Sequence, residues 1–82
     1  MTEQDIKDLG FEIHRETKYS SGMDHDWHYY TLDIGDICLI TNSNNEAVKE
    51  GWGVSIFDFP SCAIKGIGDL EDLIKIIKNN TI

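Results

Sequence analysis

Apolar residues follow a helical spacing at both ends of the chain and alternate with polar residues in between. At the N-terminus, Thr2 is a typical helix N-cap, Ile6 and Leu9 would form a short apolar stripe, and Gly10 can end the helix. Residues 11–19 then alternate with a period of two. One set is Phe11, Ile13, Arg15, Thr17 and Tyr19, and the other is Glu12, His14, Glu16 and Lys18. This pattern predicts a short first helix followed by a half-buried strand.

The next segments predict a hairpin. Residues 27–34 and 37–41 are rich in aromatic and β-branched side chains, which favour strands. Gly35 and Asp36 separate them, and a glycine in a two-residue connection favours a type II′ or I′ turn. The polar residues 42–51 predict a long loop, with a single helical turn possible at residues 46–49.

A fourth strand is expected at residues 52–59. Both of its faces are largely apolar, so we expect it to be central or covered on both sides. Pro60 has no backbone N–H to donate and should end this strand. Residues 62–67 would then form a short fifth strand at the sheet edge, with Lys65 pointing outward to protect that edge.

The last segment has the clearest helical pattern, from residue 69 to residue 78. Asp69 is the expected N-cap, and the apolar positions of the stripe are Leu70, Leu73, Ile74 and Ile77. A chain of 82 residues can bury one core only, so we expect residues 1–82 to form a single domain. The predicted class is α+β, with an antiparallel sheet of four or five strands flanked by a short N-terminal helix and an amphipathic C-terminal helix.

Charge adds the main functional indication. The chain has 15 acidic and 7 basic side chains, a formal charge of -8, and no Lys or Arg in residues 19–48. The acidic residues in this segment are Asp24, Asp26, Asp33, Asp36 and Glu46. Such a surface repels nucleic acid and attracts basic proteins, so no direct nucleic-acid binding is expected. The alternative interpretation is a surface that only keeps the protein in solution.

Aromatic residues lie among these acids in the sequence and could anchor a partner, because Trp and Tyr are frequent anchors of protein interfaces. We therefore predict a partner-binding surface that combines both types. It consists of Asp24, Asp26, Trp27, Tyr29, Tyr30, Asp33 and Asp36.

A cluster of His and Asp residues before the second strand provides a competing hypothesis, a small metal-binding protein. Its ligands would be Asp24, His25, Asp26 and His28. In an extended segment His25 and His28 point to opposite faces, and His14 could join only through a favourable strand register. We therefore predict no metal or other cofactor.

Catalytic signatures are not apparent. The sequence has no nucleophile elbow, phosphate loop or paired-carboxylate motif, so we expect a protein that is not an enzyme. The acidic N-terminus does not resemble a signal peptide, and no apolar run reaches the roughly 18 residues of a membrane span. A cytoplasmic location is expected, with Cys38 and Cys62 as free thiols.

The order of these elements resembles that of small bacteriophage and prophage proteins. The segments that carry the resemblance are residues 9–12, 29–32, 51–58 and 69–74, together with high Ile, Asn and Asp usage. Proteins of this kind include counter-defence inhibitors such as anti-CRISPR proteins, which bind a nuclease directly. The resemblance implies an acidic inhibitor of a basic, nucleic-acid-handling protein such as a CRISPR nuclease. An immunity protein or antitoxin that neutralises a basic toxin is the alternative.

Overall fold

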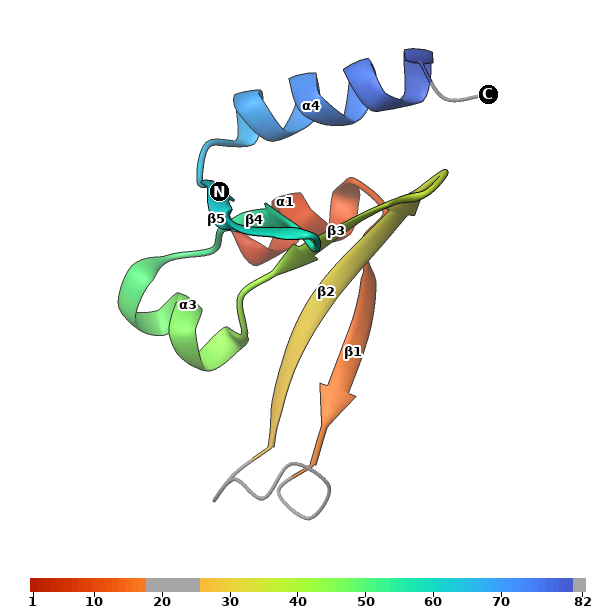
Figure 1. The fold of residues 1–82 in the computed structure, drawn as a ribbon. Coiled ribbons are helices and arrows are strands. Elements are labelled where there is room, and N and C mark those ends of the chain that lie inside the picture. The colour runs from red at the N-terminus through yellow and green to blue at the C-terminus, as the bar shows by residue number, and fades with distance from the viewer. Residues whose placement is uncertain (18–25, 81–82) are drawn as a thin grey trace.

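The five strands in the described part of the chain form one antiparallel sheet, whose spatial order, β1-β2-β3-β4-β5, follows the sequence. The computed structural model describes residues 1–17 and 26–80, with only the backbone described at residues 60–62 (Figure 1). The elements are α1 (Glu3–Asp8), β1 (Glu12–Glu16), β2 (Trp27–Ile34), β3 (Ile37–Thr41), α3 (Asn44–Glu50), β4 (Val54–Ile56), β5 (Phe59–Ile64) and α4 (Ile67–Asn80). The predicted α+β class, with one helix before the strands and one after them in the chain, is confirmed.

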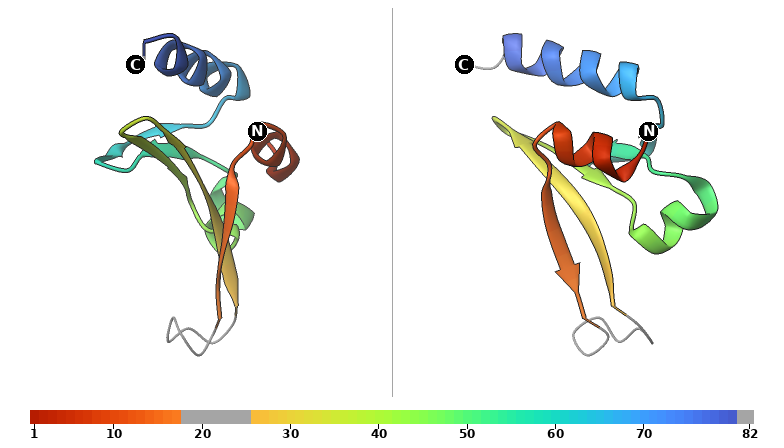
Figure 2. Two further views of the ribbon diagram at one scale, coloured as in Figure 1. Left: turned by 90° about the vertical axis from the view of Figure 1, so that its right-hand side faces the viewer. Right: turned by 180° about the vertical axis from the view of Figure 1, so that it is seen from behind.

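One face of the sheet carries the core. Directly paired residues of antiparallel strands lie on the same face, so the pairs Ile13 with Tyr30 and Leu32 with Leu39 place these four side chains together. Helices α1 and α4 lie on this side, as the two views in Figure 2 show. The buried apolar residues are Ile6, Phe11, Tyr30, Ile34, Leu39, Val54, Leu70, Ile74 and Ile77. The core is therefore a single layer between the sheet and these two helices.

The N-terminal helix forms where the sequence predicts it. The Thr2 hydroxyl accepts the Asp5 N–H, and the Asp5 carboxylate accepts the Thr2 N–H, which together satisfy two free donors at the start of α1. Gly10 has a φ of 91°, a conformation that favours glycine, and turns the chain into β1. Ile6 is fully buried against the sheet. Burial of Ile6 holds α1 in place, together with Met1 and Leu9, which pack against the same core.

The hairpin between β2 and β3 is also confirmed. Ile34 pairs with Ile37, so Gly35 and Asp36 alone form the connection. Gly35 has a φ of 59°, and no described residue other than glycine has a positive φ. Since only the first central residue is left-handed, the turn is type II′.

Helix α3 is longer than the single turn predicted within a loop. Ser43 and Glu46 form a capping box at its start, in which the Ser43 hydroxyl accepts the Glu46 N–H and the Glu46 carboxylate accepts the Ser43 N–H. Gly51, with a φ of 80°, follows the last residue of the helix. The helix covers the helical turn that was expected as an option at residues 46–49 and extends it to residues 44–50, where the sequence predicted a loop. Both signals for the longer helix are present in the sequence.

The fourth strand ends earlier, and the fifth strand begins earlier, than the sequence predicts. Strand β4 ends at Ile56, which pairs with Phe59, so Phe57 and Asp58 form a turn inside the predicted strand. Strand β5 begins at Phe59 and includes Pro60, which is compatible with an edge strand because one side of its backbone has no partner strand. The turn contains no glycine and was therefore not recognised in the sequence.

The C-terminal helix begins at Ile67, two residues before the predicted start. The Leu70 N–H donates to the Gly66 carbonyl, which places Asp69 in the first turn of the helix and not at its N-cap. Leu70, Ile74 and Ile77 are buried, as their helical spacing predicts. No helix among the described residues is long and apolar enough to cross a membrane.

Candidate functional site

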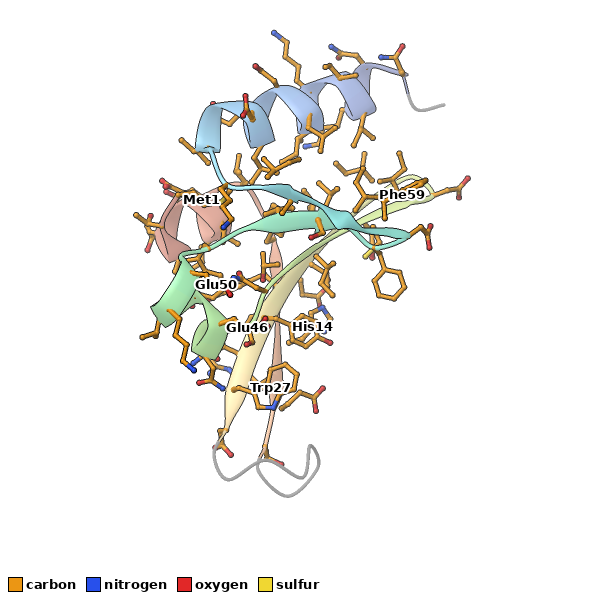
Figure 3. All side chains as sticks on the ribbon, turned by 60° about the vertical axis from the view of Figure 1, so that its left-hand side comes forward. Met1, His14, Trp27, Glu46, Glu50 and Phe59 are labelled. Atoms are coloured by element: carbon orange, nitrogen blue, oxygen red, sulfur yellow. The ribbon has the colours of Figure 1, made fainter. Side chains whose placement is uncertain are left out.

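The sheet face opposite the core is not covered by α1 or α4. The strand pairs His14 with Tyr29, Thr31 with Ile40, and Ile40 with Ser55 place these side chains on this second face. Figure 3 shows His14 and Trp27 on this side of the sheet. We call this surface the open face; its side chains are Glu12, His14, Glu16, Trp27, Tyr29, Thr31, Asp33, Cys38, Ile40 and Ser55.

A row of stacked rings lies on the open face. The ring centroids of His14 and Tyr29 are 5.2 Å apart with planes at 15°, and those of Trp27 and Tyr29 are 5.7 Å apart at 30°. His14 Nε2 lies 2.7 Å from the Thr31 hydroxyl. These contacts leave the three rings half-buried and hold them in a fixed order.

Acidic side chains flank both ends of this row. Glu12 and Asp33 are exposed near the end of β2 that carries Ile34, and Glu16 is paired with Trp27 at the other end of the row. Asp26 is exposed just before β2. Seven residues at a rise of about 3.3 Å per residue separate Asp26 from Asp33 by about 23 Å. The predicted acids therefore do not form one cluster, because consecutive positions on a long strand spread apart.

Two other predicted acids add little to this description. Asp36 is exposed in the β2–β3 turn, and Asp24 lies outside the described residues.

The negative charge of Asp33 and Asp58 also acts on the half-buried Cys38. Burial, together with a hydrogen bond to Asp33 and the nearby carboxylates, raises the pKa of the Cys38 thiol, which is free. A thiol in this environment stays protonated and is a poor nucleophile.

A shallow hollow of about 320 Å³ continues the open face toward α3. Helix α3 contributes Glu46 and Glu50 to its wall, and Figure 3 labels both residues. The other residues around the hollow are Ile40, Thr41, Asn42, Gly53, Ser55, Ala63 and Lys65. Glu46 therefore belongs to the same side of the molecule as the aromatic row, although the sequence placed it in a loop.

Tyr30 does not belong to the open face. It is 1% exposed and lies in the core, and its hydroxyl donates to the Glu3 carboxylate. The prediction of Tyr30 as a partner-binding residue is wrong because adjacent residues on a strand point to opposite faces, and Tyr29 occupies the open one.

His28 also points to the covered side of β2. Its Nε2 lies 2.7 Å from the Glu3 carboxylate, and its ring packs edge-on against Tyr30. His14 and His28 therefore lie on opposite faces, so the strand register does not bring them together. Among the described side chains of residues 1–17, 26–59 and 63–80, no three His, Cys, Asp or Glu approach closely enough to hold a metal ion. Asp24, His25 and the Cys62 side chain lie outside this set.

Two exposed phenylalanines were missed by the sequence analysis. Phe57 and Phe59 are 62% and 63% exposed at the turn between β4 and β5, next to Asp58. Large exposed apolar side chains mark possible contact surfaces. The alternating apolar pattern assigned both residues to strand four, and only the position of the turn reveals their exposure.

The Glu3 network leads to a pH-dependence prediction. The Tyr30 hydroxyl, with help from His28, lowers the pKa of the Glu3 carboxyl below its usual 4.5, whereas burial and the bond to Glu3 raise the pKa of Tyr30 to about 12. The stability contributed by ionised Glu3 is thus present above pH 4.5 and is lost as the pH falls through the lowered pKa. The stability contributed by protonated Tyr30 is present below pH 10 and is lost as the pH rises toward 12.

The urea concentration at the unfolding midpoint should therefore fall at both low and high pH. Ultraviolet titration of tyrosinate should contain one group ionising near pH 12 that disappears in Tyr30→Phe. Glu3→Gln should lose less stability at low pH than the wild-type protein does. A Tyr30→Phe protein with an unchanged tyrosinate titration would contradict this assignment.

Comparison with known proteins provides no relative: no protein-family model matches the chain, and neither a curated protein nor a solved structure shows significant similarity to it.

Proposed function

We propose that this protein is a non-enzymatic inhibitor that binds a basic protein through its open face. The observation that supports this proposal is the composition of that face. Its strands carry a stacked aromatic row and flanking carboxylates, and no described strand residue on it is Lys or Arg. Aromatic centres with charged rims are typical of protein interfaces.

The charge of the open face selects the class of partner. Carboxylates attract a basic surface over a distance and can pair with Arg side chains on contact. Glu16, which is paired with Trp27, and Asp33 lie six strand positions apart along β2, about 20 Å by strand rise. This spacing matches an extended basic surface better than a single basic pocket. The partner we propose is a protein that handles nucleic acid, such as a CRISPR nuclease, and the biological setting is phage counter-defence.

A charge-neutralised pair of variants tests this proposal. Glu12→Gln/Asp33→Asn removes two exposed charges from the open face, while Glu71→Gln/Asp72→Asn removes two exposed charges from the outer side of α4. Each protein serves as bait in host cells, and captured proteins are quantified by mass spectrometry. We expect capture of one basic protein to fall about fivefold for the open-face variant, since two rim pairs contribute about 1 kcal/mol in total.

The α4 variant is the matched control and should capture that protein at the wild-type level. Circular dichroism of all three proteins checks that the fold is retained. Equal capture by the two variants, or a captured partner that is acidic, would refute the proposal.

A further inference from the structure

A second hollow lies on the opposite side of β2 from the open face. Its volume is about 280 Å³, and its wall combines α1, β2, α3 and the segment before β4. We call it the Glu3 hollow; it is lined by Glu3, His28, Asn44, Ala47, Val48 and Trp52. From the contacts described below, we propose that the Glu3 hollow binds an arginine side chain of a protein partner.

The carboxylate of Glu3 supplies the negative charge. One oxygen, Oε2, accepts both the Tyr30 hydroxyl and His28 Nε2, while Oε1 accepts no hydrogen bond from the described residues. A carboxylate can accept about four hydrogen bonds, so Oε1 is available to a ligand. Lys7, one turn further along α1, is the nearby cation that acts on Glu3. Because its pKa is lowered, Glu3 stays ionised at neutral pH.

An indole ring supplies an aromatic surface beside this charge. The Trp52 ring lies 5.7 Å from Tyr30, at 69°, and 6.2 Å from His28. These two neighbours fix the ring before any ligand arrives. A cation over the face of a Trp ring is attracted to its π electrons, and a fixed ring loses little entropy on binding.

The flat arrangement of N–H donors on a guanidinium group favours arginine over lysine as the ligand. Guanidinium is flat, stacks on indole, and directs several N–H groups outward in one plane. The acceptors available to it are Glu3 Oε1 and Asn44 Oδ1, which already accepts the His28 N–H at 2.8 Å and retains a second lone pair. Ala47 and Val48, which is 87% exposed, offer an apolar wall to the methylene stem.

This site does not rest on the proposed function. The Glu3 hollow and the open face are on opposite sides of β2, since His28 and Tyr29 are adjacent on the strand. Failure of binding in the hollow would therefore leave the open-face proposal intact, and the reverse also holds.

The test is an NMR titration of the whole protein with N-acetyl-arginine amide, following the indole N–H signals of both tryptophans. We expect a saturable shift of the Trp52 signal at millimolar ligand and little change at Trp27, which lies on the other face. N-acetyl-citrulline amide, which has the same shape without the charge, should bind at least tenfold more weakly. N-acetyl-lysine amide should also bind more weakly than the arginine ligand.

Variants locate the site. Glu3→Gln should raise the apparent Kd about tenfold, and Glu71→Gln on α4 is the control that removes one charge elsewhere. Because Glu3→Gln also perturbs the Tyr30 network, Val48→Lys provides a second variant at an exposed position, where the added cation should weaken binding about threefold or more. A shift without saturation, equal binding of citrulline or lysine, or unchanged affinity in both hollow variants would overturn the proposal.

Discussion

Replacing Leu39 with alanine is expected to lower the free energy of unfolding by about 2–5 kcal/mol. Leu39 is fully buried on β3, opposite Leu32 on one neighbouring strand and Ile56 on the other. Its removal leaves a cavity that these well-anchored neighbours cannot fill. The loss is large for an 82-residue domain, whose total stability at 0.05–0.15 kcal/mol per residue is about 4–12 kcal/mol. Urea denaturation followed by circular dichroism measures it.

Ile37→Ala is the matched control for this prediction. Ile37 lies on the same strand and the same face, two residues away, but is 36% exposed. We expect its truncation to cost about 1 kcal/mol or less, because part of its surface already contacts water. Similar losses for both variants would mean that the core is not centred on Leu39.

The second large effect is expected for Ile6→Ala. A six-residue helix has little stability of its own, so the position of α1 depends on its tertiary contacts, and Ile6 is its one fully buried residue. We expect a loss of about 2–5 kcal/mol. Loosening α1 should also withdraw Glu3 from Tyr30, and the pKa of Glu3 should rise back toward 4.5. Urea denaturation and carboxyl NMR shifts measure the two effects.

Gln4→Ala is the control on the same helix. Gln4 is exposed, and its side chain donates to Asp8 one turn away. Losing this hydrogen bond should cost no more than about 0.5 kcal/mol and should leave the Glu3 network unchanged. If Ile6→Ala left the Glu3 pKa lowered, α1 would be held by contacts other than Ile6.

The sequence predicts those elements of the fold that are determined by a few neighbouring residues. Thr2 and Gly10 mark the ends of the first helix, Gly35 marks the tight hairpin turn, and the apolar stripe of the last helix is buried as its spacing requires. Each of these features depends on a few neighbouring residues. They were therefore readable without knowing the rest of the molecule.

The errors arose where context or an overlooked signal decides the structure. Ser43 and Glu46 form a capping box, a signal that is present in the sequence within the polar stretch predicted as a loop. The turn at Phe57 and Asp58 has no glycine to mark it, and strand pairing alone places it there. A continuous apolar run cannot reveal such a turn.

The candidate site was predicted in part. Trp27 and Tyr29 lie on the open face with Asp33, as a shared strand face requires, whereas Tyr30 alternates into the core. The absence of cations along the sequence does not bring acids together in space, because a strand separates its ends. His14 joined the aromatic row through the register of β1 against β2, which the sequence does not determine.

The strand order of the sheet has a consequence for how the chain folds. Every strand pairs with its neighbour in the sequence, so no strand must wait for a distant segment, and the entropy lost in closing each connection is small. During synthesis, we expect each hairpin to assemble soon after its second strand leaves the ribosome. Helix α4 follows all five strands in the chain, so it docks on a sheet that is already complete.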